Sequence, residues 1–150
     1  MNYKHHLHPD RLERYSFLWS EARLVVAAVA LLLGGVPVLK ALFPSPALSG
    51  PVGLVLTVTW LASGAASGYL LYRWFTGGKT LFGGKATLDT AAFLVSGVSG
   101  VNLGLTAILG TNIGMSIFSG GGIFVIVAVV YLATAFHLFK RWRASGQKVF

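Results

Sequence analysis

Polar side chains within an uncharged, glycine-rich stretch are the first candidates for chemistry in this chain. The segment 100–114, "GVNLGLTAILGTNIG", places Asn102 and Asn112 each between glycines. A side-chain amide carries two N–H donors and one carbonyl acceptor. It can therefore line a site for a passing solute, or it can join two helices by hydrogen bonds. Both interpretations are open at this point.

Asn102 belongs to a polar face if the surrounding segment is helical. At 100° per residue, Ser99, Asn102 and Thr106 fall within about 60° of arc, whereas Ser96, Gly100 and Gly104 cluster on another face. The expected partners of Asn102 are Thr57, Thr59, Ser63 and Ser67. The candidate substrate-binding or pore-lining residues are Asn102, Thr106, Ser99, Ser63, Ser67 and Asn112. The favoured interpretation is that Asn102 joins helices, and the alternative is a polar site.

Asn112 has a different expected role. It lies ten residues after Asn102, roughly 15 Å further along a continuous helix, near the end of the apolar stretch. Asparagine beside glycine is typical of a helix C-cap and turn. The alternative is a re-entrant segment over 110–122 whose backbone lines a cavity.

Few ionisable residues lie near the apolar segments. Glu21 and Arg23 are expected at the inner edge of the first span and Asp89 at the start of the third, where a carboxylate can pair with Arg73. An interfacial ion pair is the expected role of these four residues. No ionisable residue is expected at mid-depth, where it would indicate ion or proton coupling.

Metal binding and catalysis have little support. Imidazole clusters suit zinc, copper or nickel, and the candidate ligands are His5, His6, His8 and His137. The chain has no cysteine, which excludes disulfides and thiol chemistry. No nucleophile–base arrangement, paired carboxylates, Rossmann motif or phosphate loop is present. We therefore expect no enzyme activity and no cofactor.

The composition predicts an integral membrane protein that is all-α. Of the 150 residues, 55% are apolar and 11% are charged, against about 25% charged in soluble domains. The apolar residues form blocks of about 20, enough to cross a hydrocarbon core. A single transmembrane domain, residues 1–150, is expected as a four-helix bundle with spans over 24–42, 52–72, 91–109 and 121–139. Residues 1–23 are expected to form a cytoplasmic, amphipathic interfacial helix or to extend the first span, and 140–150 to form a basic tail.

The distribution of positive charge predicts the orientation. Eleven of the twelve Lys and Arg residues lie in the N-terminal segment, the middle connection and the tail, and Lys40 lies alone on the other side. The positive-inside rule then places both termini in the cytoplasm, in a prokaryotic inner membrane with anionic lipid at its cytoplasmic face. No nucleic-acid partner is expected, because the basic residues are scattered and form no known motif.

Small residues at four-residue spacing suggest how the helices associate. Such residues allow close helix approach in lipid, and they recur in 63–68 and 96–104. The favoured function is a structural or interaction subunit of a membrane assembly or homo-oligomer, packed against other transmembrane helices. The alternative is a small channel or transporter for an ion or uncharged solute, with a polar midplane site around Asn102.

Overall fold

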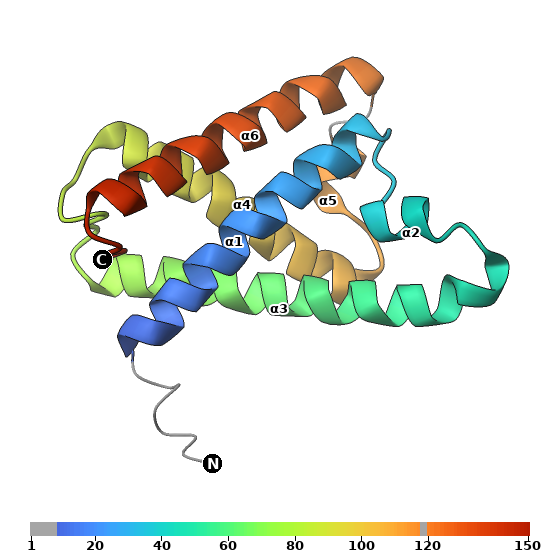
Figure 1. Ribbon diagram of the computed structural model, residues 1–150, viewed down its shortest axis with the longest axis horizontal. Helices are drawn as coiled ribbons and strands as arrows, with labels where there is room; N and C mark the ends of the chain where they lie inside the picture. Colours follow the sequence, from blue (N-terminus) through green and yellow to red (C-terminus); the bar gives the residue numbers. More distant parts are fainter. Residues whose placement is uncertain (1–8, 118–119) are drawn as a thin grey trace, which may run out of the picture.

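The computed structural model describes residues 9–117 and 120–150 (Figure 1). All of its long secondary-structure elements are α-helices. The elements are α1 (Pro9–Leu32), α2 (Val38–Leu42), the 3₁₀ turn η2 (Pro46–Leu48), α3 (Ser49–Thr76), α4 (Thr87–Leu109), α5 (Ile113–Ile117) and α6 (Gly121–Ala144). Four of these helices are long and apolar enough to cross a membrane: α1, α3 with the preceding turn, α4 and α6. The chain thus has the features of an integral membrane protein.

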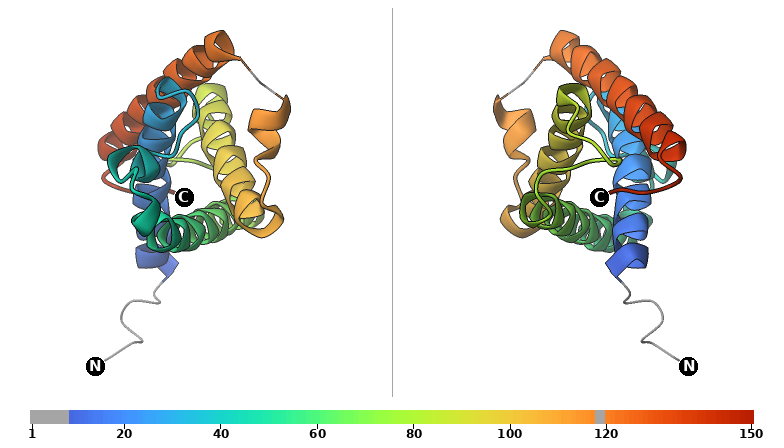
Figure 2. Two further views of the ribbon diagram at one scale, coloured as in Figure 1. Left: turned by 90° about the vertical axis from the view of Figure 1, so that its right-hand side faces the viewer. Right: turned by 90° about the vertical axis from the view of Figure 1, so that its left-hand side faces the viewer.

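The four long helices surround a central axis, as the end-on views show (Figure 2). Helix α3 packs most extensively against α4, and α1 against α6. Further contacts join α1 to α3 and α4 to α6, and a smaller one joins α1 to α4 across the middle. The backbones of α3 and α6 do not approach closely, although both helices contribute side chains to one hydrophobic core. The bundle is therefore two tight helix pairs that meet along their edges.

Helix α1 differs from the expected first span. It begins at Pro9 and ends at Leu32, whereas a helix over 24–42 was expected. The chain turns because Gly34 and Gly35 both adopt positive φ, and their N–H groups bond back to the carbonyls of Leu31 and Ala30. This is a helix-terminating arrangement that glycine favours. Residues 10–22 consequently extend α1 instead of forming a separate interfacial helix.

One end of the bundle is closed by a hydrophobic core. We call it the basic end, because it carries the connection 77–86 and the last residues of the chain. Phe17, Phe93, Leu138 and Trp142, from three helices, are almost fully buried there. The connection and the chain terminus complete this core, through buried Leu81, Phe82 and Val149 and a bond from the Phe82 N–H to the Val149 carbonyl. The opposite end, where Lys40 lies, is called the distal end.

The contact between α3 and α4 depends on glycine. A Cβ atom added to Gly64 would lie 2.6 Å from the Cα of Gly104, and one added to Gly104 would lie 2.7 Å from the Cα of Gly64. A Cβ atom added to Gly100 would collide with the Ser67 side chain. The small residues therefore serve the association of two helices within this chain, as small residues do in lipid.

Substitution of these glycines tests the close contact. We expect Gly64→Ala to lower the free energy of unfolding by roughly 1–3 kcal/mol, the usual cost of overpacking, because its methyl group collides with backbone. The matched control is Gly68→Ala one turn later, where nothing lies within 4 Å of the added Cβ. That variant should be neutral or gain up to about 1 kcal/mol from helix propensity. Denaturation in detergent micelles measures both, and equal stabilities would contradict the contact.

Candidate functional site

A large cavity lies between the long helices beyond the closed basic end. Its volume is about 1030 Å³, and most of its lining is apolar, from α1, α3, α4 and α6 together with α2 and α5. Gly35, Met115 and Phe124 line it toward the distal end, where Met115 and Phe124 pack against the turn at Gly35. Small-molecule sites typically measure about 300–1,000 Å³ and are mainly apolar with a few placed polar groups.

The polar residues expected at a site lie mostly around this cavity. Those that line it are Ser63 of α3, Ser99, Asn102 and Thr106 of α4, and Asn112. Ser67 does not line the cavity and is fully buried against Gly100. The two faces expected for the third span are present in α4, because Gly100 and Gly104 pack on α3 while Ser99, Asn102 and Thr106 face the cavity.

Arg23 is the charged side chain that lines the cavity, and its surroundings differ from the expected interfacial ion pair. It lies nine residues before the end of α1, roughly 14 Å along the axis, and is 7% exposed. Its Nη1 donates to the Ser99 hydroxyl at 3.0 Å, and its Nη2 donates to the carbonyl and hydroxyl of Ser96 at 2.8 and 3.3 Å. These bonds attach α1 to α4 across the bundle.

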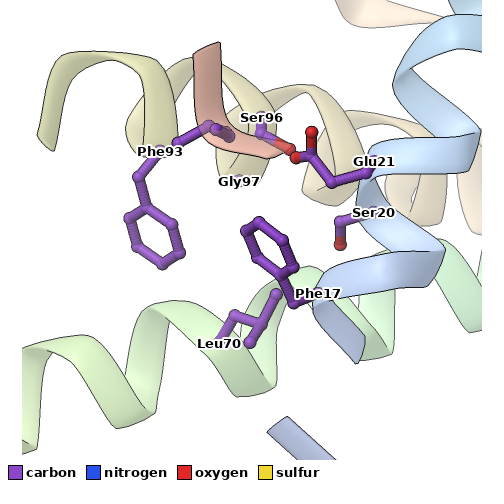
Figure 3. A pocket seen from close by; sticks show the side chains of 8 residues that line it. Phe17, Ser20, Glu21, Leu70, Phe93, Ser96 and Gly97 are labelled. Atoms are coloured by element: carbon purple, nitrogen blue, oxygen red, sulfur yellow. The ribbon is translucent and has the colours of Figure 1, made fainter. Parts of the chain in front are cut away.

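Glu21 faces a separate, much smaller cavity (Figure 3). This space, about 10 Å³, is lined by Phe17, Ser20, Phe93 and Ser96, among others. Figure 3 shows the Glu21 carboxyl pointing from α1 toward α4. Neither of its oxygens has a hydrogen-bond partner among residues 9–117 and 120–150. The volume is about that of one water-sized probe, so one water could solvate this carboxyl group.

Glu21 and Arg23 lie nearer the middle of the first candidate span than the sequence predicts. This span of α1, Asp10–Leu32, contains both Glu21 and Arg23, and both are buried in the bundle. The reason is the turn at Gly34 and Gly35, which ends the helix ten residues before the expected boundary. The spanning part of α1 is shifted toward the N-terminus as a result.

The ion pairs near the basic end also involve partners other than those expected. Arg73 pairs with Glu13, whose carboxylate accepts a bond from the Arg73 Nε at 2.6 Å. Asp89 pairs with Arg141, with Nε–oxygen distances of 2.9 and 3.0 Å, and its Oδ1 lies 2.8 Å from the His137 Nε2. These contacts join α1 to α3 and α4 to α6, so their role is to hold the closed end together.

Asn102 and Asn112 contact one another directly. The Asn102 Nδ2 donates to the Asn112 Oδ1 at 2.8 Å, and the Asn102 Oδ1 accepts from the Gly114 N–H at 3.1 Å. The expected partners of Asn102 on the second span, among them Ser63 and Ser67, are therefore wrong. Asn102 lies eight residues before Gly110, roughly 12 Å along α4. The segment that follows Gly110 must turn back along α4 to reach it.

The C-cap expected at Asn112 is instead provided by Gly110. Gly110 has φ of 72° and ends α4, with its N–H bonded to the Thr106 carbonyl. Asn112 precedes α5, and its Oδ1 accepts the Met115 N–H at 3.0 Å, which is the side-chain bond of a helix N-cap. Asn112 thus starts a short helix that folds back toward the cavity, and Ile113, Gly114 and Met115 line it.

The metal site has no support in the described part of the chain. His5, His6 and His8 lie outside the described residues, and His137 contacts Asp89. Within residues 9–117 and 120–150 no group of three or more histidine or acidic side chains is arranged to hold a metal ion.

Comparison with known proteins adds no further assignment. No protein-family model, curated protein or solved structure matches this chain. The cavity and the residues around it are therefore the features that bear on function.

Sequence reasoning missed Arg23 as part of the site. A signal was available, because between Tyr15 and Leu32 the sequence is apolar or small apart from Glu21 and Arg23. An ionisable residue within such a stretch indicates function or a specific partner. That signal was hidden by the assumption that the first helix continued through Gly34 and Gly35.

A double-mutant cycle tests the bond between the two asparagines. We expect Asn102→Ala and Asn112→Ala to be non-additive by about 0.6–1.7 kcal/mol, the range of measured hydrogen bonds within membranes. The measurement is the free energy of unfolding in micelles. The control residue is Ser116 of α5. Among the described residues its hydroxyl bonds only to the Ile113 carbonyl. The effects of Asn102→Ala and Ser116→Ala on the free energy of unfolding should therefore be additive. Additivity in both cycles would rule out the Asn102–Asn112 contact.

Proposed function

We propose that this protein is a membrane-embedded binding protein for an elongated, mostly apolar small molecule held in the large cavity. The single observation that supports this function is the cavity itself, about 1030 Å³ between helices of a 150-residue chain. Protein interiors are close-packed, and voids larger than a water molecule are few. The cavity is open along part of its wall, where Val26, Val55 and Val98 are exposed, and its apolar lining gains dispersion contacts when a molecule fills it.

The lining indicates the chemistry of the occupant. Aliphatic and aromatic side chains cover most of the wall, including Ala27 and Ala30 of α1, Leu56 and Trp60 of α3, and Val98 of α4. An apolar chain in contact with them is stabilised by its removal from water, about 25 cal/mol per Å² of apolar surface. The polar groups are few, and several of them lie on α4 and at Arg23, where they can orient the molecule.

The closed basic end favours binding over free permeation. Beyond the cavity the helices meet in the core around Phe17, Phe93, Leu138 and Trp142. A continuous pore would have to pass through these buried side chains. We therefore favour a binding or carrier function with access from the lipid or the distal end, in place of the open channel considered from the sequence.

Assembly with other helices stays a prediction. Its main motivation was the small-residue spacing in α3 and α4, and Gly64, Ser67, Gly100 and Gly104 are used in the contact between these two helices. The apolar faces that remain exposed on α3 and α6, such as Leu54, Val58, Ile126 and Val129, are equally suited to lipid.

The proposed location is a prokaryotic inner membrane, with the basic end in the cytoplasm. Lys79, Lys85, Lys140 and Arg143 gather at that end, and Lys40 lies at the other. Positive residues are retained on the cytoplasmic side of a membrane and attract its anionic lipid.

Single cysteines test this orientation directly, because the chain contains none. Ala86 lies exposed in the connection at the basic end and Ser45 lies exposed at the distal end. In intact cells, a membrane-impermeant maleimide should label Ser45→Cys, and it should label Ala86→Cys only after lysis. The reverse pattern would place the basic end outside.

Filling the cavity tests the proposed function. The probe is 12-bromododecan-1-ol, whose bromine quenches indole fluorescence on contact, and Trp19 and Trp60 both line the cavity. We expect saturable quenching of the wild-type protein in micelles. Ala27→Phe places a ring in the cavity and should raise the dissociation constant at least about tenfold, which corresponds to 1.4 kcal/mol.

Val29→Phe is the matched control for that measurement. Val29 lies two residues further along α1, is exposed, and does not line the cavity. It should bind the probe as the wild type does. Quenching that never saturates, or that is the same in Ala27→Phe and Val29→Phe, would show partition into the micelle alone and would contradict the proposal.

A further inference from the structure

Arg23 places a positive charge in the wall of a cavity whose lining is otherwise mainly apolar. Its guanidinium is more than nine-tenths buried, lines the cavity, and lies within the candidate span of α1. A cation in this position is costly and is normally paired or functional. Any role for Arg23 must account for where its positive charge is balanced.

No acidic side chain of the described residues forms a salt bridge with Arg23, although Glu21 is near enough to interact with it electrostatically. The ion pairs among residues 9–117 and 120–150 are Glu13 with Arg73 and Asp89 with His137 and Arg141. Glu21, two residues away on the same helix, has its oxygens beside the small separate cavity of Figure 3, which Arg23 does not line. The hydrogen bonds of the guanidinium therefore go to neutral serine groups alone.

The hydrogen bonds of Arg23 leave some of its N–H groups unpaired. A guanidinium has five N–H groups in a fixed fork. Nη2 donates to the carbonyl and the hydroxyl of Ser96, and Nη1 donates to the hydroxyl of Ser99. Among the described residues Nε has no partner and is itself buried, and the second hydrogen of Nη1 has no acceptor. Ser96 and Ser99 thus fix the orientation of the group without satisfying it.

We infer that Arg23 binds the oxyanion head, a carboxylate or a phosphate, of the molecule whose apolar chain fills the cavity. This inference rests on the proposed function and names the class of ligand, a long-chain amphipathic anion. Arginine is suited to the head because its planar donors match both oxyanions, and hydrogen bonds between charged groups are about twice as strong as neutral ones.

The geometry explains how head and chain are separated. Arg23, Ser99 and Trp19 lie where the closed core gives way to the cavity, and Met115 and Phe124 lie toward the distal end. A head held at Arg23 directs an alkyl chain along the apolar walls toward the distal end. Tyr131 of α6 lines the same cavity and supplies a further hydroxyl group.

Competition against 12-bromododecan-1-ol tests the inference on the intact protein. Dodecyl phosphate, dodecan-1-ol and dodecyltrimethylammonium share one chain and differ in head charge. We expect dodecyl phosphate to restore the fluorescence at a concentration at least about tenfold below that of the alcohol, and the cation to be the weakest. Inorganic phosphate should not displace the probe at these concentrations, and displacement by it would indicate a free-anion site and overturn the inference.

Variants then assign the preference to one residue. Arg23→Gln should abolish the advantage of dodecyl phosphate over dodecan-1-ol. Arg11→Gln is the matched control, because Arg11 is exposed on the same helix and its loss changes the net charge equally. Preserved selectivity in Arg23→Gln would overturn the inference.

The possible failures remain distinguishable. If the alcohol binds saturably and the phosphate binds no more tightly to the wild type, the inference is wrong and the proposed function stands. If no probe binds saturably, both the inference and the proposed function are wrong. If Arg23→Gln does not fold, the order of the three heads on the wild type decides the question alone.

Discussion

A guanidinium inside an apolar bundle must have hydrogen-bond partners, and this constraint determines how the helices of this protein meet. Arg23 obtains its partners from Ser96 and Ser99 of α4, at 2.8–3.3 Å. The bonds hold α1 to α4 at the level where the buried core of the basic end gives way to the cavity. A hydrogen bond to a charged group typically contributes about 1.5–3 kcal/mol, so this attachment and the position of the cavity are linked.

The remaining architecture follows from two kinds of helix contact. Gly64 and Gly104 bring α3 and α4 together so closely that neither tolerates a Cβ atom without a shift. Beyond Arg23, α1 is not held to α4 in this way, and the space between the two helix pairs is lined by aliphatic and aromatic groups. The bond between Asn102 and Asn112 folds α5 back toward that space. Close packing on one side of α4 and a polar face on the other thus produce both a rigid pair and a cavity.

The positions of three of the four long helices could be predicted, because each contains a block of apolar residues that is visible in the sequence. The expected spans 52–72, 91–109 and 121–139 all lie within α3, α4 and α6, and helical periodicity separated the glycine face of α4 from its polar face. The first helix was misplaced because apolar residues continue on both sides of Gly34 and Gly35, so the block does not show where the chain turns. The partners of Asn102, Arg73 and Asp89 depend on the rotation and depth of neighbouring helices, which no local pattern encodes.

The central claim is that α1 and α4 enclose a ligand whose head lies at Arg23. An experimental density map of the protein, purified with its native lipids in nanodiscs, tests this most directly. We expect an elongated density between the two helices that ends within hydrogen-bonding distance of the Arg23 guanidinium. Helices in contact along their whole length, or density with no end near Arg23, would contradict it.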